Sequence, residues 1–315
     1  MKFAFIVDAL DHLKAHKDTS VAVMRAAARR GHECWTMQRA TLAWRDGVTS
    51  ARAVRVAPQA GDAPWYAAVE ERVLPLTAFD AVLMRQDPPF DFEYIAATWL
   101  LERAEAEGAR IFNRPRAIRD HSEKVAIAEF PQLTAPTLIA RDADAVQAFI
   151  DAHADVVLKP LDGMGGSSVF RVRRDDPNRN VIVETLTQLG ARTIMAQRFL
   201  PEIAQGDKRI LLIAGEAVPY ALARTPAPGD SRGNLAAGGT GRAQPLTARD
   251  REIAQTLGPQ LWARGLLLVG IDVIGDCLTE INVTSPTCCV EIAQQTGFDV
   301  AGHFIEALEA QCRSH

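Results

Sequence analysis

The stretch Val157-Leu-Lys-Pro-Leu-Asp-Gly-Met-Gly-Gly-Ser-Ser-Val169 decides the fold class of this chain. An apolar run ends on Lys159, and glycines follow at positions 163, 165 and 166. Glycine-rich turns expose backbone N–H groups and let them approach oxyanions closely. A glycine loop that lies between two strands and beside a lysine is typical of a flap over a triphosphate. A simple tight turn is the alternative.

The common nucleotide-binding motifs do not account for this loop. A P-loop requires a Gly-Lys pair, and none occurs in the chain. A dinucleotide fingerprint requires a sixth-position glycine that opens a helix, whereas Ser168 stands there and a strand-like segment follows. The sequence also lacks the G-x-S-x-G and H-E-x-x-H motifs, and its seven histidines are scattered. Hydrolase and zinc-protease chemistry therefore have little support.

Composition indicates a globular protein that acts on small molecules. The chain has 315 residues, and its 35 basic and 39 acidic side chains give a net charge of −4. Without a basic run it is expected to bind neither nucleic acid nor an anionic membrane. The apolar segments near Asp8 and Asp272 are interrupted by charge, so neither is expected to be a signal sequence or a span. Five cysteines without C-x-x-C spacing suit a reduced, cytoplasmic compartment.

The first third of the chain alternates strands with helices. Apolar strands are expected at 3–7, 81–85 and 110–113, with helices at 20–31 and 92–108. This alternation predicts a parallel sheet with helices on its faces. The paired prolines of "QDPPFD" (86–91) force a rigid turn where one strand ends.

The rest of the chain shows a different pattern of expected strands and helices. Its expected strands include a hairpin over 206–224 and a pair that covers 266–283, and helices are expected near 142–153, 180–189, 247–264 and 298–312. The intervening loop 225–241 is long and rich in glycine, which is typical of an active-site lid or of disorder.

Three oxygen-bearing side chains lie on the last pair of strands. Asp272 ends one apolar run, and Glu280 and Asn282 stand two residues apart on the next strand, so they share a face. Hard oxygen donors suit Mg²⁺, which binds carboxylates together with substrate phosphates. The trio therefore predicts a magnesium site, with Mn²⁺ as an alternative ion.

Lys124 and Lys159 supply the opposite charge. Two unit charges about 4 Å apart interact by about 4 kcal/mol at an effective dielectric constant near 20. Bringing a carboxylate substrate to a triphosphate is therefore unfavourable unless cations intervene. Two lysines and a magnesium ion would meet that need, although either lysine alone could extend to solvent.

Taken together, these segments resemble bacterial glutathione synthetase, a family within the ATP-grasp superfamily. The matching strings, in chain order, are "MRQDPPFD" (84–91), "LKPLDGMGGSS" (158–168), "GDKRILLI" (206–213), "RGNLAAGGTG" (232–241) and "TEINVTSPT" (279–287). The resemblance implies an α/β fold of ATP-grasp type with an N-terminal substrate domain (1–121), a central lid (122–201) and a C-terminal subdomain (202–315). It also implies a homotetramer.

The resemblance further implies an ATP-dependent ligase. Its substrates would be γ-glutamylcysteine, glycine and ATP. ATP would phosphorylate the cysteinyl carboxylate, the amine of glycine would attack the acyl phosphate, and ADP and phosphate would leave. A ligase of another amino acid or dipeptide pair, such as a D-alanine–D-alanine ligase, is the nearest alternative. A nucleotide-binding regulatory module without turnover is another, although the intact charged set argues against it.

The family pattern assigns roles to individual residues of this chain. Lys124 and Lys159 would contact phosphates, 163–167 would cover them, 197–200 would read adenine and Asp207 would lie near the ribose. The complete set for the nucleotide is Lys124, Lys159, Gly163, Gly165, Gly166, Ser167, Gln197, Arg198, Phe199, Leu200 and Asp207. Asp272, Glu280 and Asn282 would hold the metal.

The remaining assignments concern the peptide and its activation. Arg209 would face the developing oxyanion, and the 225–241 loop, with Arg232 and Asn234, would close over the acyl phosphate. Ser285 and Pro286 would help to bind the peptide substrate. Arg85 and Asp87 leave the end of an N-terminal strand, where they either bind the glutamyl end or form an exposed ion pair at a Pro-Pro corner. Lys17 is a further candidate for this end.

Overall fold

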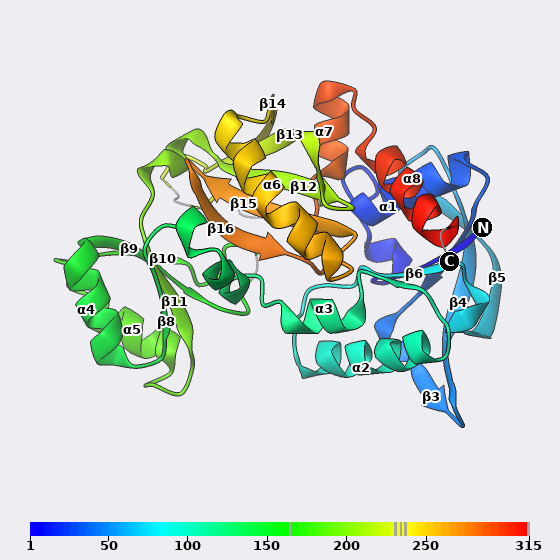
Figure 1. The fold of residues 1–315 in the computed structure, drawn as a ribbon, viewed down its shortest axis with the longest axis horizontal. Coiled ribbons are helices and arrows are strands. Elements are labelled where there is room, and N and C mark those ends of the chain that lie inside the picture. The colour runs from blue at the N-terminus through cyan, green and yellow to red at the C-terminus, as the bar shows by residue number, and fades with distance from the viewer. Residues whose placement is uncertain (164, 230–231, 234, 236–237, 314–315) are drawn as a thin grey trace.

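The computed structural model describes residues 1–163, 165–229, 232–233, 235 and 238–313. Their strands form an N-terminal, a central and a C-terminal sheet, which follow one another along the chain (Figure 1). Short 3₁₀ helices connect the larger elements: η1 (Leu10–His12), η2 (Arg39–Thr41), η3 (Leu76–Ala78), η4 (Val125–Glu129), η5 (Pro131–Leu133) and η6 (Pro201–Gln205). The described residues include no helix that is long and apolar enough to cross a bilayer.

The N-terminal sheet has a parallel centre. Its strands are β1 (Lys2–Ile6), β2 (Glu33–Met37), β3 (Ala43–Arg45), β4 (Val48–Pro58), β5 (Tyr66–Pro75), β6 (Ala81–Met84) and β7 (Ile111–Phe112). Strands β2, β1, β6 and β7 run parallel, as the sequence predicts. The side chains Phe3 to Ile6 of β1 are buried on both faces, which is characteristic of a parallel strand that has helices on both sides.

Helices complete this region, and a long hairpin extends it. The helices are α1 (Thr19–Arg29), α2 (Phe92–Ala106) and α3 (Pro115–Asp120). Asp18 and Asp91 cap α1 and α2 by accepting from backbone N–H groups. Strand β4 pairs antiparallel with β2, β3 and β5. The β4–β5 hairpin was not predicted, because its charged residues alternate with small ones and leave no strong apolar run.

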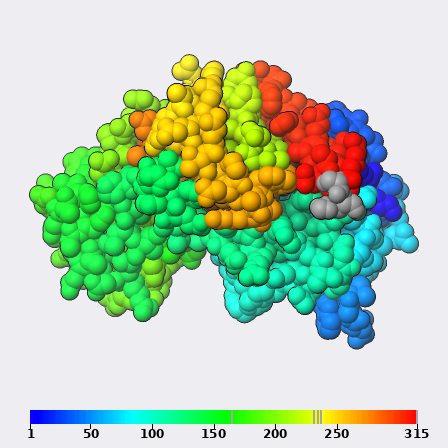
Figure 2. Space-filling view, in the orientation of Figure 1, coloured from blue at the N-terminus to red at the C-terminus, as the bar shows by residue number. Residues whose placement is uncertain are grey.

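The central sheet is antiparallel and forms a separate lobe. Its strands, in spatial order, are β10 (Phe170–Arg173), β9 (Asp155–Pro160), β11 (Ile194–Arg198) and β8 (Thr137–Ala140). Helices α4 (Ala143–His153) and α5 (Arg179–Thr187) bury Val146, Ile150 and Val183 against this sheet. Figure 2 shows the lobe in green, with an indentation between it and the region of α2 and α3.

The C-terminal sheet is antiparallel. Its strands, in spatial order, are β14 (Thr240–Pro245), β13 (Glu216–Thr225), β12 (Asp207–Ile213), β15 (Leu268–Ile274) and β16 (Cys277–Asn282). The helices of this region are α6 (Ala248–Ala263), α7 (Cys289–Thr296) and α8 (Val300–Arg313). Thr247 and Asp250 form a capping box that starts α6. Helix α8 packs against α1 and so joins the end of the chain to its beginning (Figure 1).

Candidate active site

The main cavity, of about 530 Å³, lies where the three sheets meet. The N-terminal region contributes Asp87 to its wall, the segment that precedes η4 contributes Glu123, the central sheet contributes Lys159, and the C-terminal sheet contributes Arg209 and Glu280. This volume is in the range of small-molecule sites. Segments far apart in sequence therefore converge on one pocket.

Cross-strand pairing builds one wall of the pocket. On adjacent strands, Asp207 lies opposite Arg224, Arg209 opposite Asp272, and Asp272 opposite Glu280. Residues in such register share a face of the sheet. The strand register therefore gathers two arginines and three carboxylates on one face of β13, β12, β15 and β16.

The arginines and aspartates among them form a buried ion-pair network. Arg209 donates to both carboxylate oxygens of Asp272, at 2.5 and 2.9 Å, and Arg224 Nη2 lies 2.9 Å from Asp272 Oδ2. Arg224 also donates to Asp207 at 2.5 Å. Burial raises the pKa of Asp272, but the two arginines outweigh it and hold that pKa well below its ordinary value. Burial raises the pKa of Asp207 to about 6. The network fixes both guanidinium groups at the edge of the cavity.

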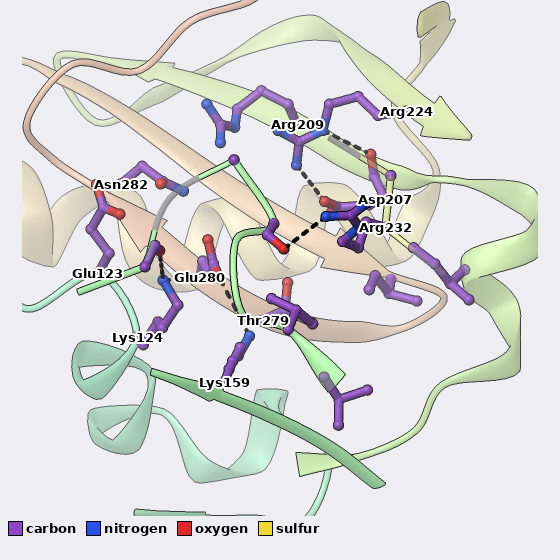
Figure 3. A pocket seen from close by; sticks show the side chains of 18 of the residues that line it. Glu123, Lys124, Lys159, Asp207, Arg209, Arg224, Arg232, Thr279, Glu280 and Asn282 are labelled. Carbon is purple, nitrogen blue, oxygen red and sulfur yellow. Dashed lines mark hydrogen bonds and ion pairs between the residues drawn. The ribbon is translucent and has the colours of Figure 1, made fainter. Parts of the chain in front are cut away.

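Two lysines meet at one carboxylate. Lys124 Nζ lies 3.5 Å and Lys159 Nζ 3.3 Å from the same Glu280 oxygen (Figure 3). Both lysines are buried, at 3% and 7% exposure. Burial raises the pKa of Glu280, yet the lysines outweigh it, so that pKa is lowered overall. The predicted convergence of these three residues is present in the structure.

The glycine loop bends over the lysines. Lys124 Nζ donates to the Gly163 carbonyl at 2.8 Å, and Arg232 Nη1 donates to the Gly166 carbonyl at 3.3 Å. Gly165 and Gly166 have φ values of 62° and 82°, in the left-handed region that favours glycine. A Cβ atom at Gly163 would lie 2.8 Å from Pro160 Cγ. The loop therefore needs its glycines for backbone shape and for close approach.

The predicted metal ligands differ in whether their side-chain oxygens are available to bind a cation. The amide nitrogen of Asn282 donates to the Gly270 carbonyl at 3.2 Å, so its amide oxygen is the atom that it can offer to a cation. Glu280 offers a carboxylate to the cavity, whereas both oxygens of Asp272 bind arginines. The described residues include no cluster of three or more His, Cys, Asp or Glu side chains that could hold a metal. The donor chemistry fits Mg²⁺ if substrate phosphates complete its shell.

The segment expected to read adenine lies along the cavity. Gln197, Arg198, Phe199 and Leu200 line it at the end of β11. However, the N–H groups of Arg198 and Phe199 already donate to the carbonyls of Pro136 and Asp155, each at 3.0 Å. To bind a base through its backbone, this segment must therefore use atoms other than these two N–H groups.

The predicted peptide-binding residues are divided. Asp87, Ser285 and Pro286 line the cavity, but the described part of its wall does not include Arg85 or Lys17. Arg85 Nη2 donates instead to the Pro286 carbonyl at 2.8 Å, and Ser285 Oγ donates to the Arg85 carbonyl at 3.1 Å. Arg85 thus ties β6 to the segment after β16.

Two other predicted residues, Ser167 and Asp272, are not part of the described wall. Ser167 belongs to the glycine loop, and Asp272 lies behind Arg209 and Arg224, which bind it. Asn234 lies outside the described residues.

Sequence reasoning missed several residues that line the cavity. They are Glu123, Arg224, Thr279, Thr284 and Cys288. Counting along the hairpin from its turn would have placed Leu222 opposite Asp207. The irregularity between Ile210 and Leu212 shifts the register, so Arg224 could not have been found by counting alone. Glu123 directly precedes Lys124, but nothing in its sequence context sets it apart. Burial raises the pKa of the Cys288 thiol.

Family comparisons cover nearly the whole chain. Residues 1–119 match the family described as "Prokaryotic glutathione synthetase, N-terminal domain", and residues 123–297 match "Prokaryotic glutathione synthetase, ATP-grasp domain". A glutathione synthetase of Ralstonia nicotianae is 58% identical over 309 residues, with 98% of this chain and 95% of that one covered. A glutathione synthetase of Nitrosomonas europaea is 60% identical over 314 residues, with 98% of each chain covered.

Solved structures share the fold at low identity. The D-cycloserine synthetase DcsG matches with a TM-score of 0.70 and 17% identity, over 99% of this chain and 100% of that one. A RimK domain protein ATP-grasp from Sphaerobacter thermophilus matches with a TM-score of 0.62 and 21% identity, over 98% and 100% of the two chains. These similarities establish the ATP-grasp fold, as the sequence predicts.

Proposed function

The chain belongs to the prokaryotic glutathione synthetase family and is an ATP-dependent ligase that joins γ-glutamylcysteine to glycine; from this premise we propose that the reaction takes place in the cavity between its sheets. ATP phosphorylates the cysteinyl carboxylate, and the amine of glycine displaces the phosphate. A carboxylate is a poor electrophile, and the acyl phosphate gives it a good leaving group. The protein's part is to position the reactants and to neutralise charge.

One observation carries this proposal. Lys124 and Lys159 come from different segments, yet their ammonium groups lie within 3.5 Å of one oxygen of Glu280. Two buried ammonium groups carry more positive charge than a single carboxylate can neutralise, so they can stabilise additional anions. Polyphosphate is such an anion, and a second anion, the peptide carboxylate, must approach it during the reaction.

We propose that Mg²⁺ binds at Glu280 and Asn282, with Asp272 as a further ligand. When bound, the ion supplies positive charge to the phosphate oxygens. Metal ligation by Asp272 requires Arg209 or Arg224 to release one of its oxygens, because both are engaged. Lys124 and Lys159 would then turn from Glu280 toward the phosphates.

Arg209 and Arg224 are the proposed donors to the developing oxyanion. Both line the cavity, and Asp272 orients both guanidinium groups. Removing one preorganised donor of this kind costs about 2.7–4 kcal/mol of transition-state stabilisation. Arg232 links the 225–241 loop to the glycine flap, so the two segments can exclude water from the acyl phosphate together.

Several finer features belong to the same proposal. Residues 1–121, 122–201 and 202–315 would act as substrate domain, lid and catalytic subdomain, in line with the order of the sheets. The Gln197–Leu200 segment would face adenine, with Asp207 near the ribose. A homotetramer and a cytoplasmic location are proposed from the family resemblance. The five cysteines, all unpaired, agree with a reducing compartment.

The experiment is coupled ADP release with γ-glutamylcysteine and glycine supplied together, singly and not at all. The proposal expects sustained ADP release only with both substrates, and one glutathione formed per ADP. Release that does not depend on glycine would remove the assigned acceptor. Replacement of glycine by alanine or serine tests the ligase of another substrate pair.

A further inference from the structure

Asp87 and Glu123 line the same cavity as the lysines, but the chemistry described above gives Glu123 no role. They come from separate places: Asp87 follows β6, and Glu123 precedes η4. The carbonyl of Glu123 accepts from the N–H of Ile281 at 2.9 Å, which fixes it beside β16. The two carboxyl groups therefore reach the cavity from separate parts of the chain.

A single hydroxyl lies between the two carboxyl groups. Thr284 Oγ1 lies 2.5 Å from Asp87 Oδ2 and 3.2 Å from Glu123 Oε1. A threonine hydroxyl carries one hydrogen, so it cannot fully satisfy two carboxylates. The pair needs hydrogen-bond donors that Thr284 alone does not provide.

An unpartnered atom of the pair shows the same need. Among the described residues, Asp87 Oδ1 is buried without a hydrogen-bond partner. Buried polar atoms without partners are rare and need an explanation.

The missing group must be a compact donor with positive charge. A primary ammonium has three N–H donors and no acceptor, which matches two carboxylates and a hydroxyl oxygen. A metal ion is a weaker match, because the described residues form no cluster of three or more His, Cys, Asp or Glu side chains. The charged groups that influence the pair are Arg39, Arg85, Lys124 and Arg209 among the cations, and Asp8 and Glu280 among the anions.

We propose that Asp87, Glu123 and the hydroxyl of Thr284 form a subsite for a primary ammonium group of a substrate, an inference that rests on the proposed function. Both amino substrates carry this group: glycine, and γ-glutamylcysteine at its glutamyl end.

The test compares three variants with a matched control. Glu123→Gln, Asp87→Asn and Thr284→Val each remove charge or one hydroxyl with little change in shape. Glu129→Gln is the control, because Glu129 lies in the neighbouring η4, away from the cavity, and pairs with Arg264. KM values for glycine, γ-glutamylcysteine and ATP are measured for each protein, together with its unfolding midpoint.

Loss of a hydrogen bond to a charged group corresponds to a change in affinity of about 10- to 100-fold. We expect Glu123→Gln and Asp87→Asn to raise the KM of one amino substrate by this factor, while the KM for ATP and the control stay within about threefold. If the KM for glycine rises, the subsite binds the amine of the acceptor. If the KM for γ-glutamylcysteine rises, the subsite binds the glutamyl amine. In the second case the variants should also lose discrimination against N-glutarylcysteine, which lacks that amine.

Equal increases in all three KM values, or none, in a folded variant would overturn the subsite. Should a carboxyl variant not fold, Thr284→Val carries the test, with a smaller rise of the same KM expected. Calorimetric binding of each amino substrate, in the presence of a non-hydrolysable ATP analogue, separates the two claims. If the wild-type protein binds γ-glutamylcysteine and glycine but forms no peptide, the proposed function is refuted. The subsite is then tested by comparing the calorimetric affinities of the same variants.

Discussion

Asp272→Asn is the substitution that tests the buried ion-pair network around Asp272 most directly. The carboxylate receives bonds of 2.5 and 2.9 Å from Arg209 and one of 2.9 Å from Arg224, and it is almost fully buried. Asparagine keeps the shape but removes the charge. Arg224 would then keep Asp207 as a carboxylate partner, whereas Arg209 would lose the one carboxylate that it pairs with among the described residues.

The expected loss follows from this geometry. One charge pair about 4 Å apart is worth about 4 kcal/mol at an effective dielectric constant near 20, and Asp272 forms two such pairs. Most of that gain offsets the cost of burying the charges. Removal of one partner from a buried pair typically costs about 3–5 kcal/mol. We therefore expect the free energy of unfolding to fall by about 3–5 kcal/mol.

Urea unfolding measures the loss, and Asp250→Asn is the matched control. Asp250 and Lys208 form a buried ion pair on the other face of β12, outside the cavity. Both variants should lose comparable stability, but only Asp272→Asn should lower kcat by 100-fold or more below the unfolding transition. An Asp272→Asn protein that unfolds like the wild type would refute the reasoning. Equal loss of kcat in the two variants would show that the effect reports folding alone.

Three further predictions concern other parts of the molecule. The hydrogen bond from Arg30 lowers the pKa of Glu309 to about 2 from 4.5. The stabilising contribution of Glu309 is therefore present above about pH 4.5 and is lost as pH falls toward 2. Glu309→Gln should flatten this acid dependence in thermal unfolding. A Cβ atom at Gly233 would lie 2.4 Å from the Arg224 carbonyl, so Gly233→Ala should lower kcat by about 10- to 100-fold, and an unchanged kcat would count against close packing of this segment. EDTA should abolish ADP release and excess Mg²⁺ should restore it; activity in the presence of chelator would remove the metal from the proposal.

Residue type and spacing were enough to predict the centre of the site. Asp272, Glu280 and Asn282 follow apolar runs on adjacent strands, so their shared face could be expected from strand geometry. Lys124 and Lys159 were expected to contact the phosphates of ATP, which stays a prediction, and the structure places both beside Glu280. These predictions depended on local alternation and on motif strings, which a sequence displays directly.

Contacts between distant segments could not be predicted in this way. Arg85 was expected either to bind the glutamyl end of the substrate or to form an exposed ion pair, whereas its guanidinium donates to the Pro286 carbonyl, 201 residues away. Glu123 gained its place from a backbone bond to β16 and from Thr284. The β4–β5 hairpin has too few large apolar residues to show a pattern. Each of these features depends on partners that only the folded chain brings together.

The most direct measurement is the affinity for an Mg²⁺-bound, non-hydrolysable ATP analogue in wild type, Lys124→Met, Lys159→Met and the double variant. The account predicts at least a tenfold loss of affinity in each single variant and coupled, non-additive losses in the double variant, because both ammonium groups lie beside the same oxygen of Glu280. Affinities that stay within about twofold of the wild type would contradict it.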